Sequence, residues 1–237
     1  RQECRQEENT AMKIHAGLVC ASAMAISGAA SADILWDQSN YDTAASAYVN
    51  QAFGNFADFS TYMVNDITVD PGGWNVTSVT TYHTYTNGIW PLSGQAQVNV
   101  FARDAAVPGA GDDPSGGMVV DFTAVDLGDG TIAITAALDM DLAAGDYWIG
   151  MTPILDFGIF GQEFHRGAPI VGLDTHFRNP GGGFGVGTDW GTAGALFAGD
   201  WDGVYDAAML VEGRVVPAPG VAALLVGGLL AVRRRRA

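Results

Sequence analysis

Alternating apolar and polar residues dominate the middle of the chain. In residues 96–102 every second position is a small or branched apolar residue, and in residues 132–138 larger apolar residues alternate with smaller ones. This period of two is typical of strands that turn one face to a core. Gly128-Asp129-Gly130 supplies the positive φ that a hairpin turn needs. Because helical periodicity is scarce, the pattern predicts an all-β domain.

Several further segments are predicted to be strands, which brings the set to about eight and favours a β-sandwich or jelly roll. Residues 74–85 are rich in threonine and tyrosine, and their apolar phase moves near Ser78, as a bulge in a long bent strand would produce. Residues 41–52 are the one segment left open as a helix. Loops are expected at 107–117 and 179–199, where proline, glycine and aspartate gather. The remaining predicted strands are 119–124, 147–151, 154–160 and 207–215.

Residues 12–32 have the three parts of a secretory signal peptide. Lys13 follows a methionine, an apolar run spans residues 16–26, and Ala30-Ser31-Ala32 forms the A-x-A pattern that signal peptidase accepts. We predict cleavage after Ala32, the alternative being a buried helix of the folded protein. Residues 1–11 are polar and are expected to be a mis-annotated or untranslated leader.

Residues 217–237 combine a proline-rich start, an apolar run and a basic tail. The run at 221–232 has 12 residues, whereas a stable membrane-spanning helix needs about 20, so a processed short hydrophobic helix fits better than a permanent anchor. The positive-inside rule places the tail in the cytoplasm and the preceding domain across the membrane. A nucleic-acid-binding patch is disfavoured because the tail directly follows an apolar run. The tail consists of Arg233, Arg234, Arg235 and Arg236.

Pro217-Ala218-Pro219, the apolar run and the arginine tail together resemble the PEP-CTERM sorting signal of Gram-negative envelope proteins. The resemblance covers residues 217–237, with alanine at 218 where the family more often has glutamate. It implies recognition by an exosortase-type membrane protease and an association with exopolysaccharide or biofilm matrix. The expected location is therefore the cell envelope or the extracellular space, with the C-terminal segment as a transient or permanent membrane anchor.

Composition narrows the chemistry of the domain predicted at residues 33–216. Both cysteines precede it, so it uses neither a disulfide nor a thiol nucleophile. The chain carries 26 acidic residues and a formal net charge of −15, which disfavours nucleic acid and anionic lipid as partners. The basic residues of this domain are Arg103, Arg166, Arg178 and Arg214.

Two candidate binding sites lie near the end of the domain. Asp200, Asp202 and Asp206 surround a glycine turn, as calcium would require, but a solvated acidic turn is the simpler interpretation in so acidic a chain. Trp190 and Trp201 stand in loops rich in glycine and aspartate, where an exposed ring could stack on a sugar. Apart from calcium, no cofactor is expected.

Glu163, His165 and His176 could form a metal site or an acid–base pair, but three independent surface residues are the simpler interpretation. The sequence contains no G-x-S-x-G elbow, H-E-x-x-H helix or phosphate loop. The leading hypothesis is a non-catalytic envelope or matrix protein. The alternative is a secreted carbohydrate-active enzyme on the same fold.

Overall fold

The computed structural model describes residues 32–44, 47–197 and 206–216. The predicted processing segments, and the candidate residues Asp200, Trp201 and Asp202, lie outside the described residues. The helices are η1 (Ala57–Phe59), η2 (Pro114–Gly116), α1 (Phe157–Phe160) and α2 (Ala193–Leu196). The strands are β1 (Asp33–Gln38), β2 (Ala47–Val49), β3 (Tyr62–Val69), β4 (Trp74–Thr86), β5 (Ser93–Ala102), β6 (Met118–Asp126), β7 (Ile132–Leu142), β8 (Gly145–Ile154), β9 (Gln162–Ala168), β10 (His176–Arg178), β11 (Gly191–Thr192), β12 (Asp206–Ala207) and β13 (Met209–Val215).

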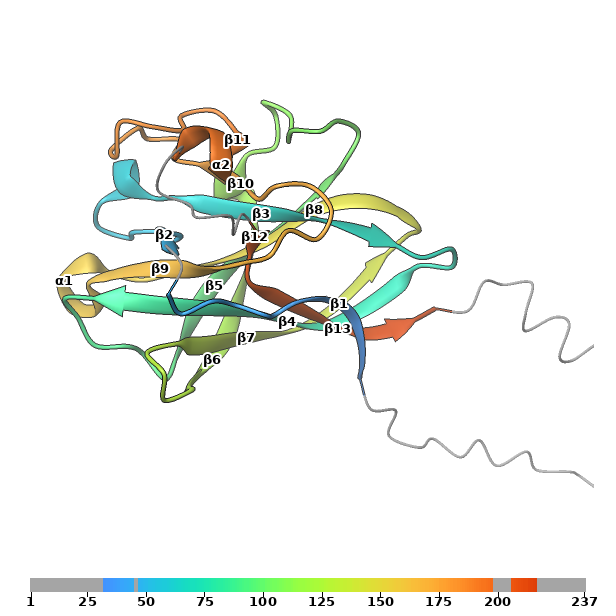
Figure 1. The fold of residues 1–237 in the computed structure, drawn as a ribbon, viewed down its shortest axis with the longest axis horizontal. Coiled ribbons are helices and arrows are strands. Elements are labelled where there is room, and N and C mark those ends of the chain that lie inside the picture. Colours follow the sequence, from blue (N-terminus) through green and yellow to red (C-terminus); the bar gives the residue numbers. More distant parts are fainter. Residues whose placement is uncertain (1–31, 45–46, 198–205, 217–237) are drawn as a thin grey trace, which may run out of the picture. The chain divides into compact units, whose positions relative to one another are not determined.

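The strands form a curled antiparallel sheet (Figure 1), which confirms the predicted all-β class. Its main path runs β1-β13-β4-β7-β6-β5-β8-β3-β10-β11, while β9 pairs with β4, β2 and β12. A parallel bridge between Ala52 and Ile154 links the segment after β2 to β8. The chain of pairings therefore returns from β8 through β2 and β9 to β4, and the curled sheet encloses its core.

The largest apolar cluster lies inside the curl and includes the alternating residues of the two patterns. Ile132, Ile134 and Ala136 of β7 are buried there together with Ala96 and Val98 of β5. The one-faced pattern of β7 is thus confirmed.

In β5, however, Gln97 and Asn99 on the opposite face are buried as well. The loop at 107–117 covers them, since Gln97 Nε2 donates to the Ser115 carbonyl over 2.6 Å. The one-faced prediction for this strand was wrong because loop packing leaves no trace in strand periodicity.

Of the other local predictions, those of a bulge and of a hairpin turn are confirmed, and that of a strand at 154–160 is wrong. The register of β4 against β7 shifts between Val76 and Ser78, which confirms the bulge. Gly128 and Gly130 adopt φ of +83° and +82°, as predicted for the hairpin. In 41–44 and 47–52, the parts of this segment that the structure describes, there is the strand β2 and no helix. The predicted strand at 154–160 was wrong, because the Asp156 carbonyl accepts hydrogen bonds from the amides of residues 159 and 160 and begins α1.

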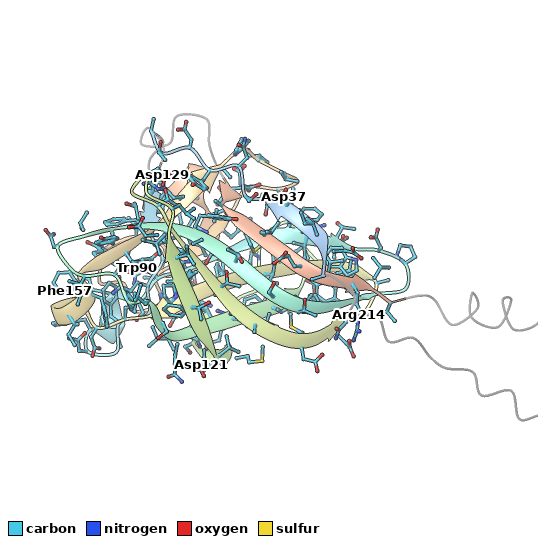
Figure 2. All side chains as sticks on the ribbon, turned by 90° about the horizontal axis from the view of Figure 1, so that it is seen from below. Asp37, Trp90, Asp121, Asp129, Phe157 and Arg214 are labelled. Carbon is cyan, nitrogen blue, oxygen red and sulfur yellow. The ribbon has the colours of Figure 1, made fainter. Side chains whose placement is uncertain are left out.

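The two ends of the folded domain lie side by side. Asp33 at the start of β1 pairs with Gly213 near the end of β13. Phe157 of α1 lies at the opposite end of the domain from Arg214 (Figures 1 and 2). The loops around α1 therefore lie at the end of the domain opposite Asp33 and Gly213.

Candidate functional site

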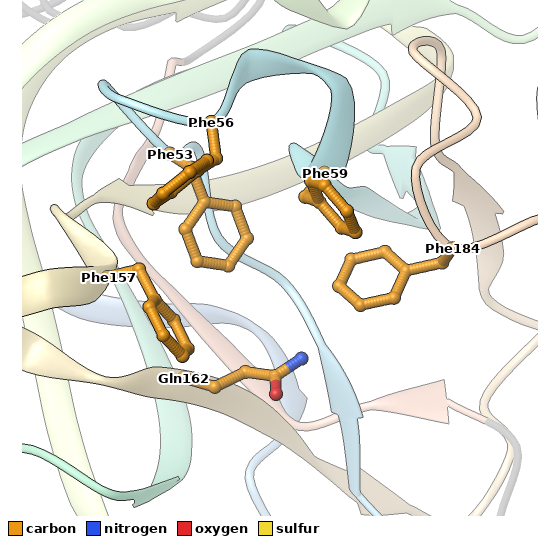
Figure 3. A pocket seen from close by; sticks show the side chains of 6 residues that line it. All are labelled: Phe53, Phe56, Phe59, Phe157, Gln162 and Phe184. Carbon is orange, nitrogen blue, oxygen red and sulfur yellow. The ribbon is translucent and has the colours of Figure 1, made fainter.

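A hollow of about 290 Å³ opens at this far end of the domain. Five phenylalanine rings from three separate loops converge on it, with Gln162 of β9 below them (Figure 3). We call it the phenylalanine hollow, and its lining residues are Phe53, Phe56, Phe59, Phe157, Gln162 and Phe184.

Most of these rings are exposed to solvent. Phe53 forms the floor with 4% of its surface exposed, whereas Phe56 is 50% exposed, and Phe59, Phe157 and Phe184 are also exposed. Phenylalanine side chains are usually buried in soluble proteins. A cluster of exposed rings around one hollow is therefore the kind of apolar surface that marks a binding site.

The rings contact one another at steep angles on two sides of the hollow. Phe56 and Phe157 meet at 83° with centroids 6.3 Å apart. Phe59 and Phe184 meet at 88° over 5.3 Å on the other side. Such edge-to-face pairs are favourable and hold each ring in a fixed orientation.

A buried asparagine joins two walls of the hollow. Asn179 Nδ2 donates to the carbonyl oxygens of Asp58 and Ser60, each over 2.9 Å. Its Oδ1 accepts from the Phe184 amide over 3.0 Å. The Gly183 amide also donates to the Asp58 carbonyl, at a place where a Cβ would collide with that backbone. The Phe59 and Phe184 walls are thus fixed to each other.

Gln51 positions the opposite wall in the same manner. Its Nε2 donates to the carbonyls of Leu155 and Gly161 over 3.0 and 3.1 Å, on both sides of α1. Its Oε1 accepts from the Glu163 amide over 2.7 Å. Because Gln51 is fully buried, these bonds are protected from water, and they connect the segments that carry Phe53, Phe157 and Gln162.

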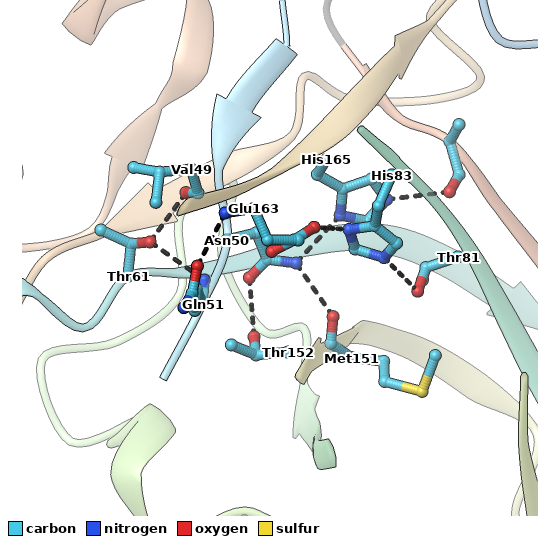
Figure 4. Close-up of polar contacts among 11 residues, drawn as sticks. Val49, Asn50, Gln51, Thr61, Thr81, His83, Met151, Thr152, Glu163 and His165 are labelled. Carbon is cyan, nitrogen blue, oxygen red and sulfur yellow. Dashed lines mark hydrogen bonds and ion pairs between the residues drawn. The ribbon is translucent and has the colours of Figure 1, made fainter. Parts of the chain in front are cut away.

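Behind this floor lies a buried polar network (Figure 4). His83 Nδ1 contacts the Glu163 carboxylate, and His83 Nε2 lies 2.7 Å from Thr81 Oγ1. The His165 ring lies 4.5 Å from the His83 ring, centroid to centroid. Burial, and secondarily the neighbouring His165, holds the pKa of His83 well below 6.5.

The prediction that Glu163, His165 and His176 are surface residues was wrong. All three are buried. Glu163 and His165 belong to the network behind the hollow, whereas His176 lies apart and packs edge-on against Trp148 at 4.5 Å. The sequence pattern did not reveal this because β9 is covered on both faces and shows no alternation of apolar and polar residues.

Trp190 is also buried, with 8% of its surface exposed. Its indole N–H donates to the Asp112 carbonyl over 2.8 Å, and the Arg178 guanidinium lies 5.9 Å from its ring. The expectation of an exposed sugar-stacking ring at this position was therefore wrong. Trp190 packs in one apolar cluster with Tyr62, Val64 and Trp148, and a glycine-rich composition does not indicate these contacts.

Of the calcium candidates, the structure places Asp206, which is fully buried. Its Oδ2 accepts from Gln38 Nε2 over 2.7 Å and from the Val171 amide over 2.5 Å. Burial raises the pKa of Asp206 to about 7. Within residues 32–44, 47–197 and 206–216 no three histidine, cysteine or acidic side chains are grouped to hold a metal. Calcium binding with Asp200 and Asp202 stays a prediction.

Sequence reasoning missed the phenylalanine hollow, although part of its signal is visible. Phe53, Phe56 and Phe59 recur at every third position among glycine, asparagine and aspartate residues. Apolar residues inside such a turn-forming segment have no strand or helix face to occupy. That Phe157 and Phe184 line the same hollow is visible only in the folded structure.

Comparison with protein-family models, with curated proteins and with solved structures found no match to this chain. In the described ranges, no helix is long and apolar enough to cross a membrane.

Proposed function

We propose that this chain is an exported, non-catalytic protein of the cell envelope or extracellular matrix, sorted by an exosortase-like protease. The observation that carries the proposal is the pairing of a signal peptide at residues 12–32 with the proline motif, apolar run and arginine tail at residues 217–237. Signal peptidase removes the first segment, and the second holds the chain at the membrane, transiently or permanently.

The position of the domain's two ends supports this topology. Asp33 and Gly213 are neighbours across β1 and β13, so both predicted processing points join the same end of the domain. An anchor at that end presents the phenylalanine hollow to the outside. We infer that the curled sheet, a β-sandwich-like domain, holds the phenylalanine hollow at a distance from the membrane anchor.

Exopolysaccharide is the matrix partner that the resemblance implies, with Trp201 as the remaining candidate for stacking on a sugar. The alternative function, a carbohydrate-active enzyme, needs two carboxylates about 5–10 Å apart in one cleft. The six residues that line the phenylalanine hollow include no carboxylate. The geometry of this site therefore favours binding over glycoside hydrolysis.

Variants of the two processing signals test the proposal. Ala32→Phe places a large residue where signal peptidase needs a small one, and we expect an unprocessed precursor in the membrane fraction. Ser31→Leu changes the tolerant middle position and serves as the matched control, with normal processing. Replacing Arg233, Arg234, Arg235 and Arg236 by serine should abolish retention at the membrane. Normal processing and localisation of Ala32→Phe and of the serine variant would refute the proposed route.

A further inference from the structure

Five aromatic rings and a nearby carboxylate, that of Asp156, are the chemical features of the phenylalanine hollow. The face of an aromatic ring carries partial negative charge, and here five rings surround one space (Figure 3). We propose that the hollow binds a small organic cation of the quaternary ammonium class. This binding site goes beyond the proposed export and sorting, and it does not depend on them.

The aromatic walls are suited to a cation because they approach it from several directions. Phe56 and Phe157 stand on one side of the hollow and Phe59 and Phe184 on the other (Figure 3), so a bound group has aromatic rings on two sides. A cation is attracted when it lies within about 6 Å of a ring centroid, and the attraction grows as water is excluded. A hollow about 290 Å³ in volume accommodates a trimethylammonium group with a short substituent.

Acidic residues adjoin the lining of the hollow in the chain, and one of them also adjoins it in space. Asp58 and Asp156 are both exposed and directly precede Phe59 and Phe157 in the chain. The Asp156 carboxylate lies beside the backbone of Gly54, next to the floor residue Phe53. None of Arg103, Arg166, Arg178 and Arg214 is among the lining residues. A carboxylate beside the floor and a lining without arginine therefore favour a cation over a fatty-acid or phosphate head group.

The lining chemistry disfavours the other occupants. A sugar needs several hydrogen-bonding partners for its hydroxyls, whereas Gln162 is the one polar side chain among the six lining residues. A neutral hydrocarbon would gain from burial but nothing from Asp58 and Asp156. A quaternary ammonium ion can use the apolar volume, the aromatic rings and the neighbouring Asp156 carboxylate together, and it requires no hydrogen bond.

Choline and its neutral carbon isostere, 3,3-dimethylbutan-1-ol, provide the direct test because they share shape and differ in charge. Each is titrated by calorimetry into the exported protein purified from the cells that make it. We expect choline to bind about tenfold more tightly than the isostere, with an affinity that falls as salt rises. Equal affinities, tighter binding of the isostere, or no binding of choline would overturn the proposal.

Variants separate cation recognition from simple burial. Phe59→Leu and Phe184→Leu keep apolar volume but remove a ring face, so choline affinity should fall several-fold while isostere affinity stays within about twofold. Asp58→Asn leaves packing intact, and it should weaken choline binding and flatten its salt dependence. Leu92→Ala, an exposed apolar position outside the lining, is the control and should bind as the parent does. Unchanged choline affinity in Asp58→Asn and in the leucine variants would overturn the proposal.

Discussion

The buried His165 makes the folded domain sensitive to acid, and His165→Gln should remove that part of the sensitivity. His165 Nδ1 accepts from Asn50 Nδ2 over 2.9 Å, and Nε2 donates to the Ala208 carbonyl over 2.8 Å. Asn50 is fixed in this orientation because its Oδ1 accepts from Thr152 Oγ1 and its Nδ2 also donates to the Met151 carbonyl. A proton on Nδ1 would therefore face another donor.

The size of the effect follows from the pKa shift. Burial lowers the pKa of His165 from 6.5 to about 4 in the folded protein. The unfolded chain therefore binds the proton first, and the stability contributed by this residue is lost as the pH falls below about 6.5. The loss is about 1.4 kcal/mol per pH unit, or about 2 kcal/mol between pH 7.5 and pH 5.

Urea unfolding of the parent and His165→Gln at both pH values measures this contribution. Glutamine can accept from Asn50 and donate to Ala208, but it does not titrate. The difference in free energy of unfolding between parent and variant should therefore shift by about 2 kcal/mol in favour of the variant on acidification. Asp206 titrates in both proteins, and His165 is not among the causes of its raised pKa, so its contribution largely cancels. An unchanged difference would refute the assignment of His165 as a buried neutral histidine.

Three further perturbations have defined outcomes. Gly150→Ala would drive a Cβ into the Met63 carbonyl of the neighbouring strand and should lower the free energy of unfolding by about 3 kcal/mol, whereas Gly116→Ala meets open space and should leave urea unfolding unchanged. Trp190→Phe loses the bond to the Asp112 carbonyl and should cost about 1–2 kcal/mol without affecting glycan binding; loss of glycan binding in a stable variant would contradict the buried structural role. Calcium should raise the melting temperature of the parent but not of an Asp200→Ala/Asp202→Ala double variant, and an unshifted parent would reject the site.

The strand pattern was predictable where one face of a strand meets the core and the other meets solvent. The alternation in residues 132–138 corresponds to β7. The change of phase near Ser78 corresponds to the bulge in β4. Prediction failed where loops cover the second face, as at Gln97 and Asn99. Such coverage depends on contacts distant in sequence, which local periodicity does not encode.

The candidate site was less predictable than the fold for the same reason. The composition around Trp190 predicts an exposed ring, yet Trp190 is buried and donates a hydrogen bond to the Asp112 carbonyl, 78 residues away in the chain. The phenylalanine hollow joins residues from positions 53 to 184. Only the triplet Phe53, Phe56 and Phe59 could have suggested it from the sequence. Phe184 is distant from this triplet in the sequence, and only the folding of the sheet brings it to the same hollow.

Intact mass spectrometry of the native protein, recovered separately from envelope and medium, tests the central claim of export and sorting most directly. The account predicts a mature species that begins at Asp33 and lacks the segment after Pro217. Persistence of Arg233–Arg236 in a membrane fraction would instead identify a permanent anchor and contradict exosortase processing. An unprocessed chain in the cytoplasm would contradict export altogether.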